Sequence, residues 1–405
     1  MITGLKLYRW QEEFVAWYSL RRRQGHHSAY LAADVGTGKT IGALAAARKV
    51  GAEDIIVIAP LSAHDSWVSE APKFGYNLKP GEDIFTYEKF NRMSVIPIGD
   101  LLILDEAHRA KNNKAKVTQK LLKHYQNEPK ILLSGTPQDR LYELYTQYKL
   151  IDPSIWQGWS WSKWVKFYYH LDSYFRPVRL QRDEYRDVIL RTIEPHTFRV
   201  NIEDVTEMPD LVTLEHKLSK SRQIAKKWRE VEADLLNPVT SFISEYAVAQ
   251  GIDPETKELF DTAKIDWALD YLEDHPQTIV FSYFRTPVVT IRNRYGNRFY
   301  YVLGDDKKDL QDAIIKGDRP IIATYSLKEG ANLQKYSSIV YLSLPLAYRD
   351  YYQSRGRIYR SGQEAKKLVV NKLLRHSIDY EVQRIVDRKM ELHEYVRERQ
   401  HLKEG

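Results

Sequence analysis

Residues 33–40 form a segment that could bind the phosphates of a nucleoside triphosphate. They read A-D-V-G-T-G-K-T, and glycines in such a loop let backbone N–H groups close around phosphate oxygens. The lysine would reach the β- and γ-phosphates, and the last threonine would ligate Mg²⁺ through its hydroxyl. Ala33 departs from the general G-x-x-x-x-G-K-[ST] form, which has glycine there. The residues that we expect to bind ATP here are Gly36, Thr37, Gly38, Lys39 and Thr40.

Two acidic residues further along the chain could supply the other half of this chemistry. Asp105 and Glu106 directly follow residues 101–104, L-L-I-L, a continuous apolar run typical of a parallel strand covered on both faces. Because α/β sheets place their ligands at the carboxyl ends of strands, we expect Asp105 to hold hydrated Mg²⁺. Glu106 would orient and deprotonate the attacking water. His108 carries a weaker signal, since a loop histidine is as often solvated or capping as functional.

A pair of arginines near the C-terminal end of the sequence could act on the same phosphates. Arg357 and Arg360 are three residues apart, a spacing that predicts projection from one side of a helix. Arginines aimed at a γ-phosphate stabilise the charge that develops during phosphoryl transfer. The alternative is a basic patch on the surface.

The elements that must position these residues form two series of strands. Apolar runs alternate with helical segments in the first part of the chain, which predicts a parallel, doubly wound sheet. The middle, from about residue 140 to 262, has mostly helical patterns, including a predicted helix over 219–236 that stops before Pro238. Alternation then returns. The strands predicted in the first series are 29–33, 55–59, 84–88, 101–104 and 131–133, and those in the second are 278–282, 299–304, 320–324, 338–342 and 367–370.

Composition narrows the class of protein. No apolar run approaches the roughly 18 residues of a membrane span and the start has no signal-peptide core, so we expect a soluble, cytoplasmic protein that does not enter a membrane. The absence of cysteine excludes disulfides and zinc–thiolate sites. The net charge of +7 suits a polyanionic partner, although proteins without one also carry such an excess. The tryptophans crowded into residues 156–164 favour an aromatic core over a base-stacking platform.

In this order, the motifs resemble the superfamily 2 helicases, and within them the Swi2/Snf2 family of DNA translocases. The segments that carry the resemblance are residues 7–11 (L-Y-R-W-Q), 34–40, 59–62 with Trp67, 105–112 (D-E-A-H-R-A-K-N), 134–137 (S-G-T-P), 330–333 (G-A-N-L) and 353–363 (Q-S-R-G-R-I-Y-R-S-G-Q). The K-N after D-E-A-H and the final R-x-G-Q are Swi2/Snf2 traits. The sequence departs from the family pattern at Val35, Arg140 and residues 198–199. The compact build is similar to that of phage and bacterial members.

The resemblance implies an α/β fold of two RecA-like parallel-sheet lobes with a helical insertion between them. The first lobe would span residues 1–200 with a helical extension from about 140, the helical linker 201–262, and the second lobe 263–405. Gln11 would select adenine. Residues expected to contact nucleic acid, or to couple it to ATP, are Ser62, His108, Ser134, Thr136, Asn332 and Gln353.

The function that the resemblance implies is that of an ATPase, with ATP and Mg²⁺ as cofactors, that moves on double-stranded or branched DNA. No long hairpin insertion that could wedge strands apart is evident in the second lobe. One alternative is a strand-separating helicase that acts on DNA or RNA. Another is an inactive ATP-binding scaffold, which the intact Lys39, Glu106 and arginine pair disfavour.

Overall fold

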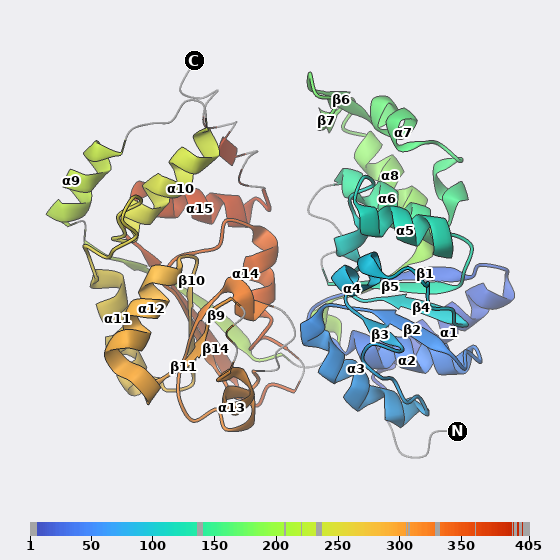
Figure 1. Ribbon diagram of the computed structural model, residues 1–405, viewed down its shortest axis with the longest axis horizontal. Coiled ribbons are helices and arrows are strands. Elements are labelled where there is room, and N and C mark those ends of the chain that lie inside the picture. The colour runs from blue at the N-terminus through green and yellow to red at the C-terminus, as the bar shows by residue number, and fades with distance from the viewer. Residues whose placement is uncertain are drawn as a thin grey trace. The chain divides into compact units, whose positions relative to one another are not determined.

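The computed structural model contains two parallel β-sheets, one in each half of the chain (Figure 1). The structure describes residues 6–135, 141–205, 208–219, 221–231, 237–304, 306, 308–328, 333–360, 362–390, 392, 395–396 and 399. The chain divides into two units, Met1–Glu207 and Met208–Gly405. In the described part, no helix is both long and apolar enough to cross a membrane.

The sheet of the first unit has the strand order β3-β2-β4-β5-β1-β8, and all of its neighbouring strands are parallel. The strands are β1 (Ser28–Ala33), β2 (Ile55–Ile58), β3 (Ile84–Phe85), β4 (Leu101–Leu104), β5 (Lys130–Ser134) and β8 (Thr197–Val200). Four of these, β1, β2, β4 and β5, are buried at every position, because helices cover both faces of the sheet. The predicted parallel sheet is confirmed.

Alternate residues of the central strands enter two separate cores. In β1, Leu31 faces a core with α1 (Arg9–Arg23), α2 (Lys39–Lys49) and α3 (His64–Glu70), whereas Tyr30 faces the other core. That second core is built from α4 (Tyr87–Arg92), α5 (Lys116–Tyr125), α6 (Leu144–Ile151), α7 (Trp161–Tyr168) and α8 (Tyr185–Ile193). Figure 1 shows α1, α2 and α3 on one side of the sheet and α5, α6 and α8 on the other.

The first unit continues beyond its sheet as the predicted helical extension. Trp156 and Trp164 are buried there, and their ring centroids are 5.3 Å apart. Trp159 and Trp161 pack against the same core, so the prediction of an aromatic core is confirmed. The extension also contains an antiparallel hairpin of β6 (Tyr169–Leu171) and β7 (Pro177–Leu180), which the sequence analysis missed.

The second unit repeats the parallel arrangement with the strand order β11-β12-β10-β13-β14-β9. Its strands are β9 (Asp210–Lys217), β10 (Thr278–Ser282), β11 (Tyr300–Val302), β12 (Ile321–Thr324), β13 (Ser338–Tyr341) and β14 (Lys367–Leu374). One face packs on α10 (Pro238–Ala249), α13 (Leu310–Ile315), α14 (Tyr348–Arg355) and α15 (Ser377–Asp387). The other packs on α11 (Ala263–Asp274) and α12 (Arg285–Tyr295). All five strands predicted for this half are present.

The segment expected to be a helical linker, 201–262, has a different structure. It contains β9, which pairs with β14 along eight residues, so residues from 208 onward belong to the second unit. The single helix predicted over 219–236 is shorter, because α9 spans only Arg222–Glu230. Pro238 begins α10 at its first helical position, where its missing N–H costs no hydrogen bond.

Candidate nucleotide site

The predicted phosphate loop connects β1 to α2. Gly36 and Gly38 both have positive φ, 84° and 88°, a conformation that glycine adopts without strain. The loop is anchored by the chain that follows β8, since the Asp34 N–H donates to the Val200 carbonyl (3.0 Å) and the Asp34 carboxylate accepts from the Ile202 N–H (3.0 Å). The sequence predicted the loop, but it did not predict β8, which holds it in place.

The polar side chains of the loop are held by its own backbone. Lys39 Nζ donates to the carbonyls of Ala33 (2.9 Å) and Asp34 (3.1 Å), and the Thr37 hydroxyl donates to Asp34 (2.8 Å). Thr40 is half-buried in the first turn of α2. The first N–H groups of a helix lack partners within it and carry partial positive charge, so this turn suits a phosphate group.

Gln11 lies directly against the phosphate loop. Its side chain is almost fully buried; the amide nitrogen donates to the Gly38 carbonyl (3.1 Å), and the amide oxygen accepts from the Tyr8 N–H (2.9 Å). A Cβ added to Gly38 would lie 2.9 Å from the Gln11 amide nitrogen, so a larger residue there would displace that side chain, and the φ of 88° would strain it. Gln11 therefore joins the start of α1 to the loop; its predicted contact with adenine stays a prediction.

The two predicted acids stand at the carboxyl end of β4. Asp105 is buried; it accepts from the Trp67 indole N–H (3.0 Å) through one oxygen and from the Glu106 N–H (2.9 Å) through the other. Burial raises the pKa of Asp105 to about 6, and the neighbouring charge of Glu106 adds to this effect. The Trp67 hydrogen bond and the charge of Lys39 oppose the rise in pKa, so the lysine of the loop acts on this carboxylate.

This arrangement fits Mg²⁺, although only a few protein oxygens are in position to bind it. Mg²⁺ prefers hard oxygen ligands and keeps several waters, so one carboxylate, one hydroxyl and substrate phosphates suffice. Asp105 and Thr40 offer those two oxygens, and a cation would relieve the repulsion between Asp105 and Glu106. No group of three or more His, Cys, Asp or Glu suited to a metal occurs among the described residues.

A chain of side chains leads from the acids to the end of β5. Nδ1 of the buried His108 lies 3.2 Å from a carboxylate oxygen of Glu106 and 3.2 Å from the Ser134 hydroxyl. The next residue of that strand end, Gly135, approaches the phosphate loop, because a Cβ there would be 3.1 Å from a Val35 methyl group. The structure thus brings Glu106, His108 and Ser134 together, and their predicted roles stay predictions.

Of Ser62, Thr136 and Asn332, three other predicted contacts with nucleic acid, the structure describes only Ser62. Ser62 lies half-buried in a short 3-10 helix, Leu61–Ala63, that follows β2. Thr136 and Asn332 lie outside the described residues.

In the second unit, the predicted arginines are not on a helix. The helix α14 ends at Arg355, and Gly356 follows as its C-cap, so Arg357 and Arg360 lie in the turn beyond. Arg357 is buried and donates through Nε to the carbonyl of the equally buried Gln353 (3.1 Å). Arg360 is partly accessible, but desolvation lowers its pKa to about 10. The spacing of three therefore reflects a compact turn and not a helical face.

Trp67 is the clearest residue to which the sequence analysis gave no role at the site. It was noted only as part of a family motif, yet its indole N–H donates to the carboxylate of Asp105. Tyr87 was also missed, and its hydroxyl donates to the Asp105 carbonyl (2.8 Å). No spacing rule links either residue to Asp105, because they reach it from α3 and α4.

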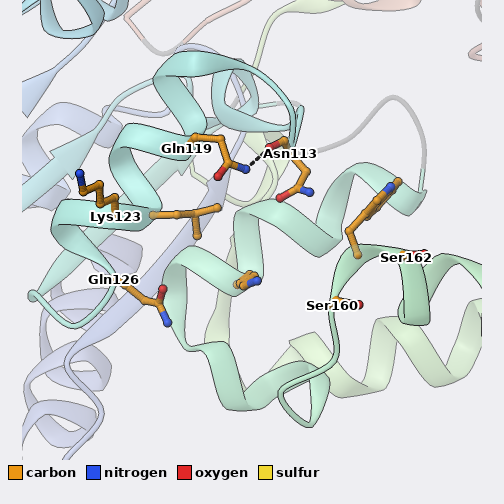
Figure 2. A pocket seen from close by; sticks show the side chains of 9 residues that line it. Asn113, Gln119, Lys123, Gln126, Ser160 and Ser162 are labelled. Atoms are coloured by element: carbon orange, nitrogen blue, oxygen red, sulfur yellow. Dashed lines mark hydrogen bonds between the residues drawn. The ribbon is translucent and has the colours of Figure 1, made fainter.

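A pocket of about 530 Å³ lies elsewhere in the first unit, between α5, α6 and the start of α7 (Figure 2). Most of the residues that line it are polar, and Gln119 donates a hydrogen bond to the Asn113 carbonyl at its edge. None of the described site residues lines it.

Two family matches cover most of the chain. Residues 83–246 match the SNF2-related domain, and residues 263–362 match the helicase conserved C-terminal domain. The chain therefore belongs to the SNF2-related ATP-dependent helicases of superfamily 2.

Several named proteins are similar to this chain. The uncharacterized ATP-dependent helicase YqhH of Bacillus subtilis is 24% identical over 91% of this chain and 76% of that protein. The ATP-dependent helicase brm of Drosophila melanogaster is 30% identical over a match that covers 32% of this chain and 10% of brm. Among solved structures, the Sulfolobus solfataricus SWI2/SNF2 ATPase core in complex with dsDNA has 19% identity and a TM-score of 0.45, covering 95% of this chain and 91% of that one.

Proposed function

We propose that this chain hydrolyses ATP and uses the energy to move along double-stranded or branched DNA. The observation that carries the proposal lies in the first unit, where a glycine loop leads into α2 with Lys39 and Thr40 in its first turn, and the buried Asp105 with Glu106 directly follows β4 close enough to Lys39 to feel its charge. A lysine for phosphate and a carboxylate pair for metal and water, acting on one another, are the parts that ATP hydrolysis requires.

Each of these residues has a separate task. Lys39 binds the β- and γ-phosphates, Thr40 and Asp105 would hold Mg²⁺, and Glu106 orients the attacking water. When bound, Mg²⁺ neutralises the charge on the phosphates. Gln11 selects adenine from its place beside the loop.

The second unit contributes Arg357 and Arg360, which stabilise charge on the γ-phosphate. Hydrolysis then requires both units. Gln353 supports Arg357, since its carbonyl accepts the hydrogen bond from Arg357 Nε.

The link to DNA runs through His108. One ring nitrogen faces both Glu106 and Ser134 at 3.2 Å, and it carries at most one proton, so it favours one partner at a time. Ser134 ends β5 and is itself fully buried, while Ser62, Thr136 and Asn332 carry the short hydroxyl and amide groups that are suited to grip a phosphodiester backbone. A shift of Ser134 on DNA binding would change how Glu106 is held.

The test is the rate of ATP hydrolysis by the whole chain with duplex DNA, single-stranded DNA, forked DNA, RNA or no nucleic acid. We expect duplex and forked DNA to stimulate most, with DNA affinity falling by about 0.9 log unit per log unit of salt for each phosphate neutralised. Glu106→Gln should bind ATP without turnover. Glu88→Gln, the same change at an exposed residue of α4, is the control. Stimulation by RNA or single-stranded DNA well above that by duplex DNA would contradict the proposal.

A further inference from the structure

The β6–β7 hairpin presents two aromatic rings to solvent at its tip. Tyr174 is 76% exposed and Phe175 is 71% exposed, the largest values among the exposed aromatic side chains of the described residues. Figure 1 shows the hairpin at the end of the first unit farthest from its sheet. Neither ring contributes to a hydrophobic core of the described part of the chain.

The base of the hairpin is firmly held. Tyr169 is buried in the aromatic core of the extension, and Leu171 and Leu180 pack against it. The Gln181 side chain adds hydrogen bonds to the carbonyls of Lys166 (2.8 Å) and Tyr169 (3.2 Å). The tip therefore stands on a fixed support.

The tip itself is an ordered turn built around Asp172. One carboxylate oxygen accepts from the N–H groups of Tyr174 and Arg176, both at 2.9 Å, and the other accepts from Arg176 Nε at 2.9 Å. These bonds hold the pKa of Asp172 below its usual range. Phe175 has φ of 58°, in the left-handed region that an aromatic residue rarely adopts. Strain of this kind persists where the surrounding structure imposes it, and it often marks a functional site.

The chemistry around the tip is aromatic and basic. The Arg176 guanidinium lies over the Tyr174 ring, 5.0 Å from its centroid, and Arg182 lies over the Tyr185 ring at 5.8 Å. Arg179 is exposed on β7. Aromatic rings with neighbouring arginines suit nucleobases, which stack on the rings while the cations neutralise the phosphates.

We infer that the β6–β7 tip binds unpaired bases of DNA, with Tyr174 and Phe175 as the stacking surface. Paired bases inside a duplex cannot reach an exposed ring, so the tip recognises a fork or another branch where strands have separated. The inference rests on the proposed function, since it assigns to this motor a preference among DNA structures. A protein partner is disfavoured because three arginines, Arg176, Arg179 and Arg182, accompany the two rings, although Val178 is also exposed on β7.

The test measures the affinity of the whole chain for three DNAs that share one duplex: blunt, forked with two unpaired arms, and forked with abasic arms. The wild type should bind the ordinary fork more tightly than the abasic fork. Tyr174→Ala with Phe175→Ala should remove that preference, a loss of roughly 5- to 150-fold for each base that stacks. Affinity for blunt duplex, and its slope with salt, should not change, because no charge is removed.

Two controls keep the result specific. The exchange Tyr174→Phe with Phe175→Tyr keeps both rings and should keep the preference. Val188→Ala removes an exposed apolar side chain of α8 and should have no effect. If the double alanine variant binds the ordinary fork as tightly as the wild type, or weakens on all three DNAs alike, the inference is wrong. If duplex DNA does not stimulate ATP hydrolysis by the wild type, the proposed function is wrong. Failure of the inference and failure of the proposed function therefore give different results.

Discussion

Buried charge is arranged in opposite ways in the two units of this protein. At the end of β4, Asp105 and Glu106 are adjacent acids whose mutual repulsion helps to raise the pKa of Asp105. In the second unit, Lys264 and Asp379 are also buried, but they pair at 2.9 Å, and Gln250 bonds to both at 2.8 Å. A cation would relieve the repulsion in the first arrangement, whereas the second already pairs opposite charges.

The second arrangement ties distant parts of the chain together. The other oxygen of Asp379 accepts from the backbone N–H groups of Arg375 (2.8 Å) and His376 (3.0 Å). Arg375 in turn forms an ion pair with Asp261 and donates to the Ser219 carbonyl (2.7 Å). Ser219, Gln250, Asp261 and Lys264 are thereby fastened to the end of β14 and the start of α15. Buried charges that are paired with opposite charges hold the fold together, whereas adjacent like charges are typical of a ligand site.

The largest effect that this comparison predicts is on turnover at the first site. Lys39→Ala should abolish ATP hydrolysis while leaving the chain folded, because the hydrogen bonds from Lys39 Nζ to the carbonyls of Ala33 and Asp34 lie within the loop itself. ATP hydrolysis and thermal melting are measured together. Lys49→Ala, at the exposed end of the same helix, should retain both activity and stability. Appreciable ATP hydrolysis by Lys39→Ala would contradict the assignment of the first site.

The next effect tests whether Arg360, a charge of the second unit, acts in ATP hydrolysis or only stabilises the fold. Arg360→Ala should lower turnover by roughly 10²- to 10⁴-fold with nucleotide binding nearly unchanged, as for arginines that act on the transition state. Arg360→Lys should recover little, because an ammonium group lacks the planar guanidinium fork. Arg294→Ala, on the exposed face of α12, is the control. A loss of stability with normal turnover would place Arg360 with the structural charges instead.

A smaller effect, on stability, should come from the paired network. Asp379→Asn leaves the Lys264 ammonium buried without its countercharge, which should cost about 3–5 kcal/mol. Hydrogen exchange of α15 and denaturant unfolding both report it. Asp387→Asn, exposed at the end of the same helix, should change stability by less than about 0.5 kcal/mol. Equal effects of the two substitutions would show that the network does not hold the fold.

The smallest effect is a pH dependence of stability, with the sign expected for an acid whose pKa is raised by burial. The pKa of Asp105 is about 6 in the folded chain, above the ordinary value of about 3.9, so its stabilising contribution is present below pH 4 and is lost as the pH rises through 6. Asn does not titrate. The stability of Asp105→Asn relative to the wild type should therefore rise by on the order of 3 kcal/mol between pH 4 and pH 7.

Denaturant unfolding at several pH values measures this difference. Asp65→Asn, at an exposed residue of α3, serves as the control for the substitution itself. A stability difference between Asp105→Asn and the wild type that does not change with pH would contradict the raised pKa of Asp105.

The sequence predicted those parts of the fold and site that depend on local patterns. Continuous apolar runs marked the covered strands, such as β4 and β10, and the glycines marked the phosphate loop. The edge strand β9 was missed because most of its residues are exposed or half-exposed, so it has no apolar run. Trp67 was given no role because its contact with Asp105 depends on how α3 packs beside β4. The position of Arg357 and Arg360 could not be foreseen, since helical spacing also fits the tight turn that they occupy.

The pairing of β9 with β14 has a mechanical consequence. The chain leaves the sheet of the first unit at β8 and enters that of the second at β9, and each is an edge strand paired in parallel with one neighbour. A pull transmitted through the chain between the units enters each sheet at the end of one of these strands, and its component along the strand loads the hydrogen-bonded ladder in shear. The eight paired residues of β9 would share that tension. A motor that drags against an obstacle is therefore built to pass force through its sheets while its loops carry out the chemistry.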